Sequence, residues 1–308
     1  MRSARTQLRS LLKDAVERVL ASSLARAVGQ RRLCGARLTL AYHNVTLAER
    51  PVGGDASLHL PFDQFRSQLD AILEARLEVV RVDAPAADPA GRPQIAITFD
   101  DAYAGAVELA VPELSSRGWP TTVFVAPALL GSAAPWWDLL ADPRLKAVPA
   151  AIRRAALAEL AGDAAAVMAQ AAARSWPLQR ARAEHRIATA EELDAMLARH
   201  SEPALAAHSW SHPNLAAVDQ SRLHHELTAP LQWLRARWPD RTLPWLAYPY
   251  GLESAAARSA AAGAGYEGAL LVTGGWRRGP AEQLALPRLN VTPGVSLHGF
   301  RARLSGAR

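Results

Sequence analysis

The segment Ile95–Asp101, with the sequence IAITFDD, constrains the fold most, because a run of apolar and β-branched residues leads directly into two adjacent carboxylates. Such a run is typical of a strand covered on both faces, as in the parallel sheets of α/β proteins. Asp100 and Asp101 cannot both be buried without partners, since an unpaired carboxylate in a protein interior is very costly. Successive strand residues point to opposite faces, so the chain must turn here if both carboxylates serve one site.

Strand and helix patterns alternate along most of the chain. Strands are predicted at Arg37–His43, Leu77–Val82, Ile95–Phe99, Pro120–Ala126, Pro203–Ala207, Trp245–Tyr248, Gly268–Thr273 and Leu284–Val291. Helices are predicted at Phe62–Leu73, Tyr103–Arg117, Asp219–Trp238, Glu253–Ala264 and Val295–Leu304. This alternation predicts an α/β protein built on a parallel sheet or barrel.

Residues 131–200 interrupt the alternation with alanine-rich helical sequence, which we interpret as a helical insertion. Within it, Thr189–Glu192 forms a capping box for a helix that ends near His200. The adjacent Trp136 and Trp137 either stack against a sugar ring or anchor the insertion to the barrel. We favour the anchor, because tryptophan side chains are commonly mostly buried. The predicted division is therefore an N-terminal segment, 1–34, and a barrel, 35–308, that carries the insertion.

Residues 5–33 predict a basic amphipathic helix, with leucines and valines at helical spacing and arginines elsewhere around the turn. Such a helix either lies on an anionic membrane surface or packs against its own domain. The segment has no Trp or Phe to anchor it in a membrane, which favours packing. No stretch reads as a signal peptide or a transmembrane segment, so we expect a protein that is cytoplasmic or peripheral to the inner membrane.

The net charge of +6 and the pI of about 10.1 raise nucleic acid as a partner. All the basic residues except Lys13 and Lys146 are arginines, and they are scattered through the chain rather than gathered into one stripe. We therefore predict no nucleic-acid partner. Cys34 is the only cysteine, which excludes an internal disulfide and any zinc site built on several cysteines.

Two histidines with four-residue spacing, His208 and His212, follow the predicted strand Pro203–Ala207. Together with Asp101 from another strand end, they would give two imidazoles and one carboxylate around a divalent cation. That set leaves coordination positions open, as in catalytic zinc sites, so zinc is the favoured ion. Both segments follow parallel strands, and active sites of barrels lie at the carboxyl ends of such strands.

Three motifs together resemble one family. Thr98–Asp101 (TFDD), His208–His212 (HSWSH) and Pro249–Gly251 (PYG), in this order and spacing, resemble the polysaccharide deacetylase (NodB homology) family, also called carbohydrate esterase family four. The resemblance covers about 37–304. It implies a distorted seven-stranded (β/α) barrel and a metal-dependent hydrolase that removes N-acetyl groups from an amino-sugar polysaccharide or glycolipid.

The resemblance also implies roles for single residues. Asp101, His208 and His212 would hold the metal, and Asp100 would be the general base. The backbone N–H of Tyr250 would stabilise the oxyanion.

The family's general acid is a histidine on a late strand, and here the sequence departs from that pattern. His298 is the only late histidine and falls on a predicted helix, whereas His43 ends an early strand. A chain whose histidine ends a strand before the acidic pair resembles the branch of the family that includes poly-N-acetylglucosamine deacetylases. We therefore assign the general acid to His43 and keep His298 as the alternative. A second departure is Ala247, where many members have an arginine that orients the catalytic aspartate. We expect Arg288 to supply that guanidinium from another strand.

Two other functions stay open at this stage. The same scaffold could hydrolyse a non-sugar amide, or the chain could be a pseudoenzyme that binds glycan without turnover. The complete set of Asp100, Asp101, His208 and His212 argues against the pseudoenzyme. The remaining histidines are interpreted as surface or helix residues: His59, His185, His200, His224 and His225.

Overall fold

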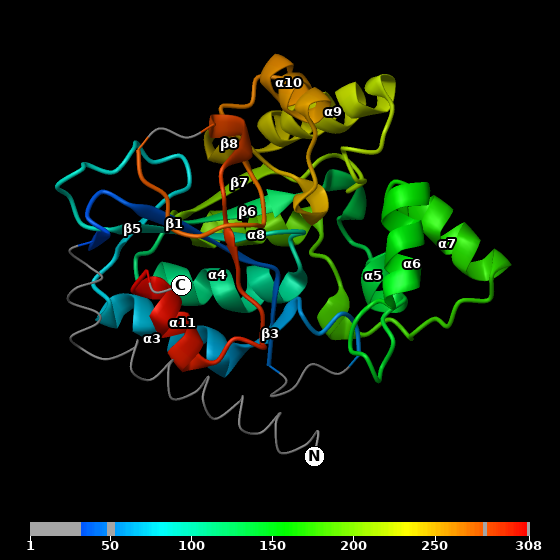
Figure 1. Cartoon of the computed structure of the whole chain (residues 1–308), viewed down its shortest axis with the longest axis horizontal. Helices are drawn as coiled ribbons and strands as arrows, with labels where there is room; N and C mark the ends of the chain where they lie inside the picture. The colour runs from blue at the N-terminus through cyan, green and yellow to red at the C-terminus, as the bar shows by residue number, and fades with distance from the viewer. Residues whose placement is uncertain (1–31, 48–52, 280–281, 307–308) are drawn as a thin grey trace.

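The computed structural model describes residues 32–47, 53–279 and 282–306. The predicted amphipathic helix at 5–33 lies outside the described residues except for its last two positions. The main sheet has eight parallel strands (Figure 1). Seven of them follow the order β10 (Leu289–Asn290), β1 (Arg37–Tyr42), β5 (Gln94–Phe99), β6 (Thr121–Val125), β7 (Pro203–Ala207), β8 (Thr242–Ala247) and β9 (Gly268–Leu270). The eighth, β4 (Glu78–Val80), also pairs with β5. A separate parallel pair is formed by β2 (Asn44–Thr46) and β3 (His59–Pro61).

One short segment, Leu286–Asn290, joins the two ends of this strand order. Its first residue pairs with Leu270 in β9, and its last two residues pair with Leu40 and Ala41 in β1. The sheet therefore forms the distorted seven-stranded (β/α) barrel that the family resemblance implies. The prediction of one long strand at 284–291 was wrong. The structure has a 3₁₀ turn, Gln283–Ala285, and then the two-residue strand β10.

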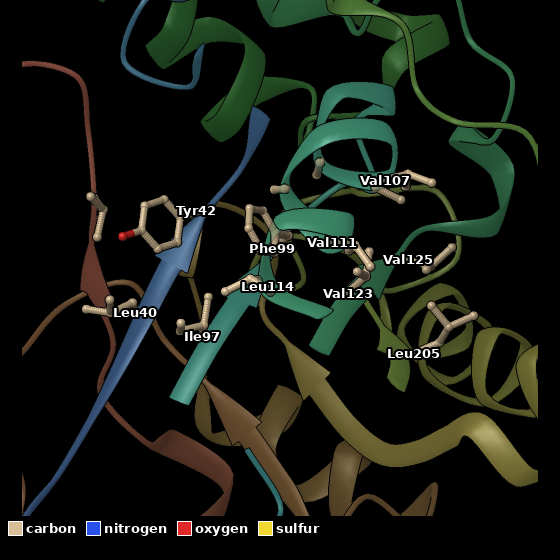
Figure 2. Packing of buried hydrophobic residues seen from close by; sticks show 14 of the residues in the cluster. Leu40, Tyr42, Ile97, Phe99, Val107, Val111, Leu114, Val123, Val125 and Leu205 are labelled. Carbon is tan, nitrogen blue, oxygen red and sulfur yellow. The ribbon is translucent and has the colours of Figure 1, made fainter. Parts of the chain in front are cut away.

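Strand β5 shows how the sequence pattern sorts side chains between two cores. Ile95, Ile97 and Phe99 belong to the cluster between sheet and helices (Figure 2), and Ala96 belongs to the cluster inside the barrel. Burying one such Ile or Phe side chain contributes about 1.5–3 kcal/mol. Because side chains alternate along a strand, Thr98 and Asp100 share the inward face with Ala96. The strand therefore delivers the first carboxylate to the barrel interior.

Helices cover the outer face of the sheet. They are α3 (Phe62–Glu74), α4 (Val111–Ser116), α8 (Ala190–Arg199), α9 (Gln220–Arg237), α10 (Ala255–Gly263) and α11 (Leu297–Leu304), and the π-helical turn Ala106–Ala110 precedes α4. The predicted capping box of α8 is present, with both the Thr189 and the Glu192 side chains bonded to the backbone. No helix among the described residues is long and apolar enough to cross a membrane.

The insertion forms its own cluster beside the barrel. Its helical elements are α5 (Trp136–Leu139), α6 (Ala150–Arg154), a π-helical turn (Ala155–Glu159), α7 (Ala164–Ala173) and a 3₁₀ turn (Ala183–His185). Figure 1 shows α5, α6 and α7 together at one side of the molecule. The last helix of the predicted insertion, α8, instead packs Leu193 and Met196 into the barrel's outer core. This helix therefore covers the sheet, as the other outer helices do.

Candidate active site

The acidic pair lies where β5 ends, and the chain turns there as expected. The Asp100 backbone N–H donates to the Tyr42 carbonyl at 2.9 Å, which continues the pairing with β1 by one residue. Asp101 then has a φ of 68°, in the left-handed region. Aspartate is one of the few non-glycine residues that adopts this region routinely. The turn lets two successive carboxylates line the same pocket.

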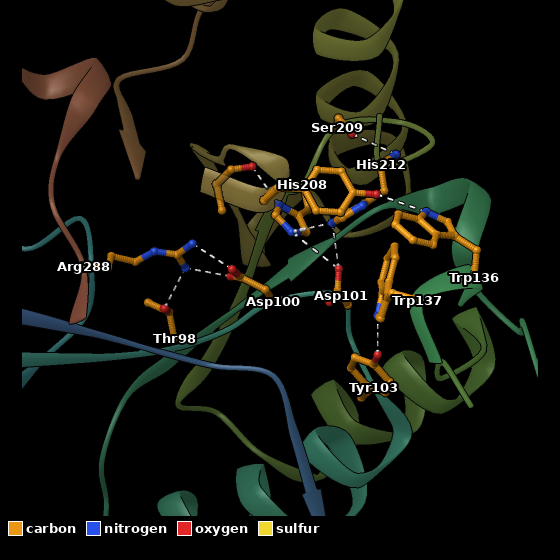
Figure 3. Close-up of polar contacts among 12 residues, drawn as sticks. Thr98, Asp100, Asp101, Tyr103, Trp136, Trp137, His208, Ser209, His212 and Arg288 are labelled. Carbon is orange, nitrogen blue, oxygen red and sulfur yellow. Dashed lines mark hydrogen bonds and ion pairs between the residues drawn. The ribbon is translucent and has the colours of Figure 1, made fainter. Parts of the chain in front are cut away.

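Asp101, His208 and His212 come together in a buried cluster (Figure 3). The two histidine Nε2 atoms are 3.2 Å apart. Asp101 Oδ1 lies 3.1 Å from Nε2 of His212 and 3.5 Å from Nε2 of His208. Tetrahedral coordination with bonds of about 2.0–2.1 Å requires ligand atoms about 3.3 Å apart. The three separations therefore fit ligands of a single ion.

Hydrogen bonding fixes which atom of His208 can bind a cation. Its Nδ1 lies 2.7 Å from the Ala247 carbonyl, so this nitrogen carries the proton and donates it. The lone pair is then on Nε2, which faces Asp101. Asp101 Oδ1 is buried and has no hydrogen-bond partner of acceptable geometry among the described residues. A divalent cation would satisfy both atoms.

Burial shapes the protonation of these three groups. It raises the pKa of Asp101, lowers that of His208, and lowers the pKa of His212 to about 4. Both imidazoles are therefore neutral at neutral pH and can offer lone pairs to a metal.

Glu226 holds the loop between the two histidines, a role that the sequence analysis missed. Its Oε2 accepts the backbone N–H groups of Trp210 and Ser211 at 2.9 and 2.8 Å, and its Oε1 accepts the Ser211 hydroxyl. Its side chain is buried. The signal was a glutamate within the apolar stripe of α9, next to Leu227, because a buried charge needs partners.

Asp100 is held by Arg288 through two parallel hydrogen bonds. Nη1 and Nη2 donate to Oδ1 and Oδ2, each at 2.7 Å, and Nη1 also donates to the Thr98 hydroxyl at 3.1 Å. Burial alone would raise the pKa of Asp100, but the guanidinium outweighs it and holds the pKa well below its ordinary value. Asp100 is therefore ionised at neutral pH. The guanidinium reaches it from the residue before β10, while Ala247 at the end of β8 has no such group.

The two candidate general acids lie in different places. His43 directly follows β1 and lines the pocket with Asp100 and Asp101. Its Nδ1 is buried without a hydrogen-bond partner among the described residues, and burial lowers its pKa. His298 is an exposed residue of α11 and does not line this pocket. The structure thus brings His43, and not His298, next to the acidic pair.

The pocket is a cavity of about 110 Å³. Its other lining residues are Asp55, Ser57, Leu58, Trp137, Arg153, Tyr250, Val272 and Asn290. Tyr250 has a φ of 60°, and its ring lies 4.6 Å from that of His212. Ser209 and His212 also adopt left-handed backbone, with φ of 60° and 62°. Such strained non-glycine residues concentrate at functional sites.

Trp136 and Trp137 are both buried, as expected of an anchor. Trp136 Nε1 donates to the Tyr250 hydroxyl at 3.2 Å. The Trp137 ring lies 4.7 Å from His212 and forms part of the pocket wall. The insertion therefore contributes Trp137 and Arg153 to the pocket. The sequence analysis did not identify Arg153, or Asp55 in the loop before β3, as pocket residues.

The surface interpretation of His59 was wrong. His59 is in β3 with 0% exposure, and His185, in the 3₁₀ turn of the insertion, is only 3% exposed. They lie in a second buried group with Asp138. The interpretation failed because their partners are far away in the sequence, so no local pattern marks them.

A parallel barrel with an acid pair and an Asp–His–His cluster at its strand ends defines the chain as a barrel enzyme with a candidate metal centre. Residues 87–269 match the family model described as polysaccharide deacetylase. This match spans more than half of the sequence. The chain belongs to the polysaccharide deacetylase family and is a carbohydrate deacetylase by this membership.

Solved structures share the fold at low sequence identity. The deacetylase PplD from Streptococcus pyogenes, solved in complex with acetate, aligns with a TM-score of 0.60 and 15% identity, over 87% of this chain and 98% of that one. IcaB from Ammonifex degensii aligns with a TM-score of 0.59 and 16% identity, over 88% of this chain and 97% of that one. The BpsB deacetylase domain from Bordetella bronchiseptica aligns with a TM-score of 0.53 and 16% identity, over 83% of this chain and 96% of that one. A search of curated proteins found no significant match.

Proposed function

We propose that this protein is a metal-dependent hydrolase that removes N-acetyl groups from an amino-sugar polysaccharide or glycolipid. One observation carries the proposal: three buried ligand atoms lie 3.1–3.5 Å apart beside a carboxylate that Arg288 keeps ionised. Asp101, His208 and His212 would hold the cation, and the two neutral imidazoles make zinc the favoured ion.

The chemistry requires a nucleophilic water, a place for negative charge and a proton for the leaving amine. A bound cation supplies an acidified water and polarises the acetamide carbonyl. Asp100 accepts the proton of the attacking water, and Arg288 fixes the plane of the accepting carboxylate. The backbone N–H of Tyr250 donates to the oxygen on which negative charge develops.

His43 is our candidate for the general acid. It lies in the pocket, and the charges of Asp100 and Asp101 raise its pKa against the stronger effect of burial. Negative charge that develops beside the imidazole favours its protonated form further. His43 then donates a proton to the amine nitrogen as the C–N bond breaks.

We propose that the substrate is an N-acetylated glycan or a glycolipid intermediate, met in the cytoplasm or at the inner membrane surface. Family membership supports the sugar and the N-acetyl group. Of the two interpretations of the basic sequence at 5–33, the less favoured one, contact with an anionic membrane surface, would bring the enzyme to a lipid-linked substrate. Recovery of the full-length protein entirely in the soluble fraction of a low-salt lysate would contradict the membrane contact.

The test combines metal analysis with acetate release. Purified protein is expected to bind one equivalent of divalent metal and to release acetate from N-acetylglucosamine oligomers. Asp100→Asn should lower the rate about 10²- to 10⁴-fold with the metal retained. Asp142→Asn, which lies outside the pocket, should not. An unchanged rate in Asp100→Asn would reject the mechanism. Metal binding without acetate release from sugar oligomers would favour a non-sugar amide or a glycan-binding pseudoenzyme.

A further inference from the structure

A second buried polar network lies between the insertion and β3, and the mechanism above does not use it. Asp138 of α5 is at its centre with 1% exposure. Its Oδ1 lies 2.9 Å from His59 Nε2 and accepts the Asp55 backbone N–H at 2.8 Å. Its Oδ2 accepts the Tyr103 hydroxyl at 2.8 Å. Every one of these neighbours is placed as a donor to the carboxylate.

Asp138, His59 and His185 lie close enough together to suggest a second metal site, but hydrogen bonding opposes it. The Asn44 amide nitrogen donates to the Glu184 carbonyl at 2.6 Å and to His59 Nδ1 at 3.0 Å. The His59 proton is therefore on Nε2, which points at Asp138. A protonated nitrogen has no lone pair for a metal.

The arrangement of the two imidazole rings also opposes a metal site. The rings of His59 and His185 stack at 4.4 Å with 18° between their planes, so their in-plane lone pairs do not converge on one point between them. A Cβ added at Gly54 would lie 2.7 Å from Asp138 Oδ1 and 2.9 Å from His59 Nε2. A side chain at position 54 would therefore clash with both atoms, so the close approach of this loop requires glycine.

One arm of the network leads to the candidate metal centre. The Tyr103 hydroxyl donates to Asp138. It also accepts the Trp137 indole N–H at 2.8 Å, as Figure 3 shows. The Trp137 ring in turn lies 4.7 Å from the ring of His212. The position of Asp138 therefore fixes the position of the Trp137 indole, which packs against the candidate metal ligand His212.

The other arm leads to the pocket wall. Asp138 holds the backbone N–H of Asp55, whose side chain lines the pocket. Asp55 Oδ1 accepts the Ser57 backbone N–H at 3.1 Å and hydroxyl at 2.6 Å. Its Oδ2 lies 3.8 Å from Arg153 Nη1, beyond hydrogen-bond length, and is left to accept a hydrogen bond from a substrate hydroxyl.

We propose that Asp138 is a positioning residue that holds Trp137 against His212 and fixes Asp55 in the pocket wall. This inference rests on the proposed function, because it concerns the same pocket. Burial alone would raise the pKa of Asp138, but the hydrogen bond from His59 and the nearby imidazoles keep it below its ordinary value. An ionised carboxylate accepts stronger hydrogen bonds than a neutral group, which suits a fixed anchor.

Tyr103→Phe tests the arm through Trp137, since it removes one hydroxyl and keeps the ring. Tyr266→Phe is the matched control, because Tyr266 is also buried, donates its hydroxyl to the Leu227 carbonyl at 2.8 Å, and does not line the pocket. The measurements are the thermal midpoint, the zinc affinity in competition with a chromophoric chelator, and kcat/KM for acetate release.

Both variants should lower the midpoint by similar amounts. Only Tyr103→Phe should weaken zinc binding and kcat/KM, each by about 10-fold, as removal of groups behind metal ligands typically does. Equal zinc affinity and equal kcat/KM in the two variants would overturn the proposal and leave Tyr103 a purely structural role.

Metal stoichiometry separates the remaining explanations. Wild type and His59→Gln should both bind one equivalent of zinc. Two equivalents in wild type that fall to one in His59→Gln would overturn the proposal, because the network would then be a metal site. A wild type that releases acetate from none of the oligomers would reject the proposed function alone, since the zinc affinities of the tyrosine variants still test the positioning of Trp137.

Discussion

Arg288 binds both oxygens of Asp100 from a segment two strands away in the sheet order, because β1 lies between β10 and β5. The bonds are parallel and equal at 2.7 Å. A guanidinium makes this planar fork and an ammonium does not. The pair therefore fixes both the charge and the orientation of the carboxylate.

Arg288→Lys should keep the positive charge and lose the fork. We expect kcat to fall about 10- to 100-fold, the range typical of removing support behind a catalytic group. Arg258→Lys, in an ion-pair cluster on the surface, is the control and should keep its rate. A full rate in Arg288→Lys would show that charge alone suffices.

Replacing Arg288 by leucine should instead destabilise the fold. Asp100 would stay buried without its cation, and breaking one side of a buried ion pair costs about 3–5 kcal/mol. Urea denaturation measures the free energy of unfolding. The double variant Arg288→Leu with Asp100→Asn should recover part of the loss, and a lack of recovery would contradict this cause.

His43→Ala should lower acetate release, whereas His298→Ala should leave it near normal. The reason is position, since only His43 lines the pocket. General acid catalysis typically contributes about 10²- to 10⁴-fold, which sets the expected loss. Rates measured with a substrate whose leaving amine has a low pKa should recover in His43→Ala. The reverse pattern, with His298→Ala inactive, would reassign the acid.

Glu226→Ala should loosen the loop that carries His212. The backbone N–H groups of Trp210 and Ser211 would lose their acceptor, at a cost of about 1–3 kcal/mol in unfolding free energy. Zinc affinity should weaken as well. Glu159→Ala, which removes an exposed glutamate with a 4.0 Å ion pair, is the control and should change neither quantity. Unaltered zinc binding in Glu226→Ala would show that the loop holds its shape without this carboxylate.

The free energy of unfolding of the protein should depend on pH through the ionisation of Asp138. Its pKa is lower in the folded state than the ordinary value of about 3.9. A lowered carboxyl pKa stabilises the fold above the unfolded-state pKa, and this contribution is lost as pH falls through the folded-state value. The difference in unfolding free energy between wild type and Asp138→Asn should therefore shrink from pH 6 to pH 3. A constant difference would contradict an ionised Asp138.

Gly251→Ala should disrupt the turn after β8. Gly251 has a φ of 68°, and a Cβ there would lie 2.1 Å from Val272 Cγ2, beside the pocket. Left-handed backbone alone costs a non-glycine residue about 1–2 kcal/mol. Gly263→Ala is the control and should be neutral or stabilising, because Gly263 lies in α10 and a Cβ added there would meet open space. Equal thermal midpoints for the two variants would contradict the steric argument.

Local patterns in the sequence account for much of the fold and of the candidate site. The apolar run of β5 predicts a buried strand, and two carboxylates at its end require a turn, which the φ of Asp101 shows. The expectation that Arg288 lies beside Asp100 rests on the family resemblance, because the arginine that orients the catalytic aspartate in many members is missing at Ala247.

Other features depend on contacts between distant residues. Asp138 and His59 are 79 positions apart, and no periodicity links an insertion helix to a three-residue strand. Helix α8 was grouped with the insertion because composition alone does not reveal which surface its apolar face covers. Apolar residues at 284–291 predicted one strand, but the pairing partners change from β9 to β1 within it.

The segment Leu286–Asn290 both closes the barrel and carries the cation that keeps Asp100 ionised. A local opening of this one segment would therefore separate Arg288 from Asp100, the proposed base, while the rest of the sheet remained hydrogen-bonded. Low denaturant concentrations should then abolish turnover before the spectroscopic signal of the helices changes. Loss of activity would then indicate that this one segment has opened, and not that the whole molecule has unfolded.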